Sequence, residues 1–154
     1  MRRLEPALFA VALAALVLLV GAEGRRRVEL ERRVAVEPRE LYHRLAHSQQ
    51  AVQVVDIRPD LSAGYEDSHL PGALPMPGCD LARTPAAARA RILRTAPTVV
   101  VSATGSREEV EACLGRFTAA RSLAGGMAGW DAVSLPEDSG EYAPPSAKAG
   151  GGCL

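Results

Sequence analysis

The loop of residues 102–107 (SATGSR) has the residue types of a site that binds or attacks an anion. It follows the β-branched run 98–101 and precedes an acidic helix start, which predicts a strand–loop–helix turn. Such a turn directs several backbone N–H groups toward one point, with the helix N-terminus behind them. Gly105 allows a tight turn, and the Arg107 guanidinium suits an oxyanion. We therefore predict an anion-binding loop made of Ser102, Ala103, Thr104, Gly105, Ser106 and Arg107.

Ser102 stands at the first position of this loop, where a cysteine would ionise readily. A serine hydroxyl needs a nearby base before it becomes nucleophilic. The histidines are His43, His47 and His69, and no spacing places any of them beside Ser102. A serine hydrolase is therefore disfavoured, because no nucleophile, base and orienting group can be named together.

The chain has three cysteines, Cys79, Cys113 and Cys153. An odd and sparse set is not typical of a disulfide framework, so free thiols are predicted. Cys113 reads as a small packing residue of a helix, Cys79 as an exposed or half-buried loop residue, and Cys153 as part of the tail. The spacings indicate no zinc site, and we predict no metal and no cofactor.

Short apolar strands alternate with helices along residues 34–130, which predicts an α/β domain with a mostly parallel sheet. Strands are expected at residues 34–36, 51–57, 98–101 and 121–124, with a two- or three-residue strand in the proline-rich stretch 69–77. Helices are expected at residues 38–47, 81–94 and 106–117, with a last helical turn after Gly125. We divide the chain into an N-terminal segment (1–27), a folded domain (28–136) and a disordered tail rich in Pro and Gly (137–154).

Residues 7–22 form an apolar run between arginine clusters, which predicts an N-terminal hydrophobic helix that binds the membrane. More arginines follow the run than precede it, and positive charge favours the cytoplasmic side. We therefore expect a single-pass anchor with the soluble domain in the cytoplasm. The alternative is export after cleavage of a signal peptide at Ala22. The rest of the chain is mildly acidic with scattered arginines, which argues against nucleic-acid binding.

Four motifs, in order along the chain, resemble those of the rhodanese-like family. They are Asp56-Ile57-Arg58, the HLPGA stretch at residues 69–73, the strand and loop of residues 99–107, and the LAGGMAGW stretch at residues 123–130. The resemblance covers roughly residues 33–136. It implies a three-layer α/β sandwich whose active members carry sulfur as a cysteine persulfide, on a loop that begins with the cysteine and closes with an arginine.

Matching Arg107 to that arginine puts Ser102 at the cysteine position, with the loop length of a sulfurtransferase. We therefore expect a catalytically degenerate binding or regulatory module, with enzymatic activity disfavoured, that binds a small oxyanion, a sulfur-containing ligand or a protein partner. The alternative is an active sulfurtransferase or thiol relay that uses Cys79, Cys113 or Cys153. Supporting roles are expected for four residues: an ion pair of Asp56 and Arg58, a structural His69 and a core Trp130.

Overall fold

The computed structural model describes residues 12–22, 35–47 and 52–144. The chain divides into two compact units, Met1–Val34 and Ala35–Leu154. In the first unit, residues 12–22 are helical with exposed apolar side chains, and Leu18 is 73% exposed. None of the helices in these described ranges is long and apolar enough to cross a membrane. Residues 7–11 of the predicted anchor lie outside the described residues.

The second unit is built on a five-stranded sheet whose strands are all parallel, in the order β1–β5–β4–β2–β3. The strands are β1 (Ala35–Val36), β2 (Gln53–Asp56), β3 (Leu74–Pro75), β4 (Thr98–Val101) and β5 (Ala120–Leu123). β4 has the predicted bounds, and β1, β2 and β5 differ from the predicted strands only by trimmed or shifted ends. β3 is a two-residue strand within the stretch 69–77, as predicted. The α/β prediction with a parallel sheet is confirmed.

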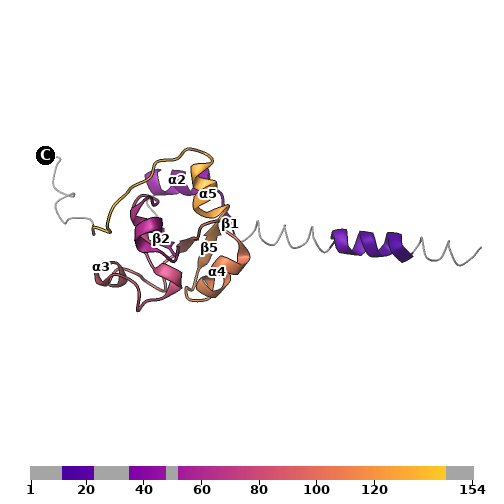
Figure 1. Ribbon diagram of the computed structural model, residues 1–154, viewed down its shortest axis with the longest axis horizontal. Helices are drawn as coiled ribbons and strands as arrows, with labels where there is room; N and C mark the ends of the chain where they lie inside the picture. Colours follow the sequence, from indigo (N-terminus) through magenta and orange to yellow (C-terminus); the bar gives the residue numbers. More distant parts are fainter. Residues whose placement is uncertain (1–11, 23–34, 48–51, 145–154) are drawn as a thin grey trace, which may run out of the picture. The chain divides into compact units, whose positions relative to one another are not determined.

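Helices cover both faces of this sheet (Figure 1). The long helices are α2 (Pro38–His47) and α4 (Arg107–Leu114), and the short ones are α3 (Ala86–Arg89) and α5 (Gly126–Asp131). A π-helix, η1 (Leu61–Glu66), and a 3-10 helix, η2 (Pro77–Cys79), flank β3. In Figure 1, α2 and α5 lie above the sheet, and α3 and α4 lie below it.

The alternation of side chains along the central strands fills two separate cores. Val54 and Val99 belong to a cluster with Leu41 and Trp130, on the face of α2 and α5. Val55 and other intervening residues belong to a second cluster on the face of α4. Both faces of the central strands are therefore buried, as a parallel sheet covered by helices requires.

The predicted helix 81–94 is observed as the single turn α3. Pro85 has no N–H to donate and restricts the residue before it, so a helix cannot continue through residue 84. Thr84 instead bonds back to the Asp80 carbonyl at 2.8 Å in a local turn. After α3, the Leu93 N–H donates to the Gln53 side chain at 2.8 Å, which takes it away from a helical partner.

Residues 137–144, predicted to belong to a disordered tail, pack on the domain. Asp138 and His69 exchange two backbone hydrogen bonds of 2.8 Å, and the Gly140 N–H donates to Glu66 O at 2.7 Å. The Tyr142 ring packs against the core of α2 and α5. Composition favoured disorder, but these backbone bonds and the aromatic contact hold the segment. Residues 145–154 of the predicted tail lie outside the described residues.

The prediction of free thiols is wrong for two of the three cysteines, because Cys79 and Cys113 form a disulfide. Cys79 ends η2 and Cys113 lies on α4, and their Cα atoms are 5.6 Å apart although 34 positions separate them in sequence. Both residues are buried in the core below the sheet, with exposures of 5% and 0%. The bond therefore links the segment after β3 to the helix that follows residues 102–107. Cys153 lies outside the described residues.

Candidate functional site

The loop of residues 102–107, called the Ser102 loop below, lies at the carboxyl edge of the sheet. It leaves β4 directly after Val101, which pairs with Asp56 at the end of β2. Ser102 is 3% exposed, whereas Ala103 and Thr104 are exposed. The predicted strand–loop–helix turn is therefore observed, with its first residue buried and its next two at the surface.

The N-terminus of α5 holds this loop through its backbone. The Met127 N–H donates to Ser102 O at 2.8 Å, and the Ala128 N–H donates to Ala103 O at 3.1 Å. This close approach depends on glycine, since a Cβ on Gly126 would lie 2.5 Å from both Gly105 N and Ser102 O. The Gly-Gly pair of the LAGGMAGW stretch thus serves to bring the first N–H groups of α5 onto the loop.

The Ser102 side chain takes part in the hydrogen bonding of the loop. Its Oγ accepts a hydrogen bond from the Gly105 N–H at 2.9 Å. The Thr104 N–H also donates to Glu109 Oε2 at 3.0 Å. Hydrogen bonding from the Ser102 hydroxyl and then from Thr104 and Gly105 lowers the pKa of Glu109, although burial opposes the shift. The loop's donors therefore converge on an anion that the chain itself supplies.

Glu109 contacts the Ser102 loop, although the sequence motifs did not single it out. Ser106 caps α4 and Glu109 lies at its third helical position, which is the S-x-x-E signature of a capping box. In a capping box the glutamate bonds to the N–H of the capping residue. Here Glu109 reaches two residues further back, to Thr104, and Ser106 makes no side-chain cap. The S-x-x-E signature predicts the start of α4. It does not predict the contact of Glu109 with Thr104, which depends on how the loop folds.

Arg107, the last residue of the Ser102 loop, is the first residue of α4. Its guanidinium pairs with Glu111, with Nη2–Oε1 at 3.0 Å, and the two side chains are 61% and 64% exposed. This pair lowers the pKa of Glu111. An exposed ion pair at this spacing contributes little to stability.

No histidine of the described residues is in position to activate Ser102. His43 and His47 lie on α2, with ring centroids 4.8 Å apart and ring planes tilted by 37°. His69 Nδ1 is bonded to Tyr65 O at 2.7 Å. Glu109, which does contact the hydroxyl, is a weak base because its pKa is lowered. The expectation against a serine hydrolase stays a prediction.

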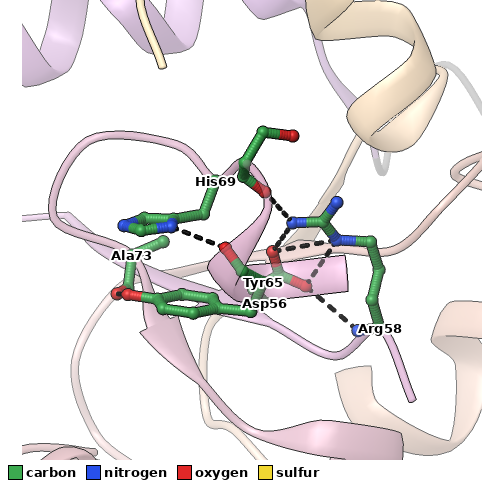
Figure 2. A network of polar contacts seen from close by, with 6 residues as sticks. Asp56, Arg58, Tyr65, His69 and Ala73 are labelled. Carbon is green, nitrogen blue, oxygen red and sulfur yellow. Dashed lines mark hydrogen bonds and ion pairs between the residues drawn. The ribbon is translucent and has the colours of Figure 1, made fainter. Parts of the chain in front are cut away.

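Asp56 and Arg58 form a buried ion pair at the end of β2, as predicted from the sequence (Figure 2). Arg58 Nη2 lies 2.6 Å from Asp56 Oδ2, with side-chain exposures of 11% and 1%. The Arg58 backbone N–H also donates to Asp56 Oδ1 at 3.0 Å, and the guanidinium donates to Ser68 O. The pair thus fastens the segment before the HLPGA stretch to the strand beside the Ser102 loop.

Tyr65 and His69 complete the network of Figure 2 as a stacked pair, with ring centroids 3.9 Å apart and planes 7° apart. The Tyr65 hydroxyl donates to Ala73 O at 2.7 Å. Burial, and then the nearby Asp56, raise the pKa of Tyr65, so the phenol stays protonated. His69 therefore has a structural place in the fold. Trp130 is 0% exposed and bonds to Pro136 O at 3.0 Å, as a core residue does.

A surface cavity of about 530 Å³ lies elsewhere on the domain, along the start of β2 and the segment 138–143. Its walls include His69, Tyr65 and Tyr142, and none of the residues of the Ser102 loop. The Tyr142 hydroxyl is buried without a hydrogen-bond partner among the described residues. This cavity and the Ser102 loop are therefore separate features. In the described part of the chain, no cluster of His, Cys, Asp or Glu could hold a metal ion.

The family model described as "Rhodanese-like domain" matches residues 37–133, more than half of the chain. The chain belongs to the rhodanese-like family. The family, its α/β fold and its parallel central sheet are as the sequence motifs predicted. No curated protein gives a significant match.

Several solved structures are similar to this rhodanese-like domain. The Alr3790 protein from Anabaena sp. has 26% identity and a TM-score of 0.56, covering 70% of this chain and 94% of its own. A thiosulfate sulfurtransferase from Pseudomonas aeruginosa has 25% identity and a TM-score of 0.53, covering 69% of this chain and 19% of its own. A full-length protein from Lactobacillus plantarum has 19% identity and a TM-score of 0.61, covering 77% and 98%, and shows the fold alone. The domain thus has a sulfurtransferase-type fold.

Proposed function

We propose that this protein is a catalytically degenerate rhodanese-like module that binds a small oxyanion, or a partner that presents one, through the Ser102 loop. One observation carries the proposal. The position from which the loop would present a thiolate holds Ser102, whose Oγ accepts a hydrogen bond from the Gly105 N–H. A persulfide requires a sulfur nucleophile, and a hydroxyl in this bond does not supply one.

Glu109 supports the same proposal through its charge. Hydrogen bonding from the Ser102 side chain, which a neutral hydroxyl can offer, lowers the pKa of its carboxyl group. A thiolate at position 102 would meet that carboxylate as a like charge, and a nearby like charge disfavours ionisation. The surroundings of position 102 therefore suit a serine and disfavour the anionic sulfur of a working sulfurtransferase.

The binding half of the proposal rests on the donors of the loop. The Thr104 N–H donates to the Glu109 carboxylate, and the Gly105 N–H donates to Ser102 Oγ. Thr104 is exposed whereas Ser102 is buried, and Arg107 is the first residue of the next helix. Backbone N–H groups at a helix start, together with a cation, suit sulfate, thiosulfate or a carboxylate as ligand.

The test is transfer of sulfur from thiosulfate to cyanide, beside detection of persulfide by mass spectrometry. We expect no turnover by the wild-type domain, and persulfide on position 102 in Ser102→Cys. Ser106→Cys is the matched control, because it places a thiol in the same loop away from the nucleophile position. All variants carry Cys153→Ser so that no other reduced thiol contributes. Turnover by the Cys153→Ser parent would refute the proposal.

The alternative of an active enzyme now depends on Cys153. Cys79 and Cys113 are bonded to each other and buried, so neither is a free thiol in this state. A comparison of the wild type with Cys153→Ser isolates the remaining thiol. Activity that disappears with Cys153→Ser would favour the relay and remove the case for a purely binding role.

We also propose that the domain works outside the cytoplasm, with residues 7–22 acting as the export signal or membrane anchor. A buried disulfide is typical of proteins from oxidising compartments. It favours the exported alternative over the cytoplasmic side that the arginine-rich flank indicates. Alkylation of acid-quenched cells expressing the full chain should find Cys79 and Cys113 oxidised. Recovery of both cysteines as thiols would contradict this proposal and favour a cytoplasmic location of the domain.

A further inference from the structure

We propose that the Glu109 carboxylate is a built-in occupant of the Ser102 loop, which an anionic ligand of the loop has to displace. The inference rests on the proposed oxyanion-binding function and names what regulates that site. It makes Glu109 the residue that sets which anions the loop accepts, because a ligand must bind better than a carboxylate already tethered beside it.

The geometry places Glu109 where such a ligand would bind. Its Oε2 lies 3.0 Å from Thr104 N, which is the distance of a normal N–H···O bond. Hydrogen bonding from Ser102, and then from Thr104 and Gly105, lowers the pKa of the same carboxylate. These are the loop's ligand-directed groups, so an incoming oxyanion and Glu109 compete for the same bonds.

Glu109 lies close to the loop in sequence, and its side chain can move away from the loop. Glu109 lies in the first turn of α4, four residues after Gly105, and its side chain is exposed to solvent. A rotation of this side chain toward water would free the Thr104 N–H without moving α4. The Arg107–Glu111 pair on the same helix is exposed as well, so an entering anion could recruit Arg107 as Glu109 leaves.

The measurement is a thiosulfate titration at constant ionic strength, followed by the amide resonances of Thr104 and Gly105. Glu109→Gln removes the charge and keeps the shape, and Glu108→Gln is the matched control from the same helical turn. We expect Glu109→Gln to bind thiosulfate about fivefold or more tightly than the wild type, because an anion within about 4 Å no longer opposes the ligand. Glu108→Gln should change the affinity by less than about twofold, as a charge further from the ligand does.

Two outcomes separate this inference from the proposed function. If the wild type binds thiosulfate and both variants change its affinity equally, the displacement model is overturned and the binding function stands. If neither the wild type nor any variant binds an anion, the proposed binding function is wrong. A second measurement then tests whether Glu109 occupies the loop. On acidification, the Thr104 amide shift should follow the Glu109 carboxylate in the wild type and not in Glu109→Gln. An amide shift that is the same in both would overturn Glu109 as occupant.

Discussion

Gly126 is the position where a single added methyl group tests how closely the Ser102 loop is held. Its φ is 56°, in the left-handed region, and a Cβ there would lie 2.5 Å from Gly105 N and Ser102 O. The left-handed conformation costs other residues about 1–2 kcal/mol, and overpacking costs about 1–3 kcal/mol. We therefore expect Gly126→Ala to lower the free energy of unfolding by about 2–5 kcal/mol.

Two matched glycines separate these costs in urea unfolding, with the disulfide intact in every variant. Gly72 has a φ of 70° but nothing within 4 Å of an added Cβ, so Gly72→Ala should lose about 1–2 kcal/mol for the backbone alone. Gly115 has a φ of −66° and open space, so Gly115→Ala should be unchanged or stabilised by up to about 1 kcal/mol. If Gly126→Ala loses no more than Gly72→Ala, the close approach of the loop to α5 carries no energetic weight, and the reasoning fails.

Reduction of the Cys79–Cys113 bond should lower the free energy of unfolding by about 4 kcal/mol, because the bond closes a loop of 34 positions. Unfolding in urea with and without a thiol reductant measures this loss, and equal curves would contradict it. Asp56→Asn should destabilise the domain by about 3–5 kcal/mol, since the buried Arg58 charge loses its partner; a loss below about 1 kcal/mol, as for an exposed pair, would mean that Arg58 is solvated. The lowered pKa of Glu109 adds stability that is present above its unfolded-state pKa and is lost as the pH falls through the folded-state pKa. The difference in unfolding free energy between wild type and Glu109→Gln should therefore shrink on acidification, and a constant difference would exclude this linkage.

The strands and the longer helices were predictable because their signals are local. The run 98–101 is β-branched and buried on both faces, and it gave β4 with its observed bounds. Pro38 and the spacing of Leu41 and Leu45 gave α2 in the same way. The helix predicted at residues 81–94 was too long, because the helix propensity of its alanines and arginines was given more weight than Pro85. Pro85 prevents a continuous helix and precedes the single turn α3.

The disulfide and the Glu109 contact could not be predicted from local pattern because both are products of the fold. Cys79 and Cys113 are 34 positions apart, and their Cα atoms lie 5.6 Å apart after η2 and α4 pack below the same sheet. Glu109 carries a capping-box signal, which predicts a bond within its own helix. The turn at Gly105, with φ at 71°, brings Thr104 within reach of that carboxylate instead.

Ser102 and Glu109 form a chemically consistent pair, and this pair decides how the loop should be interpreted. The scaffold of the loop is complete, because α5 binds its carbonyls and Gly126 allows the approach. What differs from a persulfide site is the charge at its centre, where a neutral hydroxyl donates to a carboxylate. A thiolate and this carboxylate would repel each other, whereas an external oxyanion can replace the carboxylate on the same donors. We propose that the loop exchanges one anion for another, and the Glu109 carboxylate would limit persulfide formation at a cysteine placed at position 102.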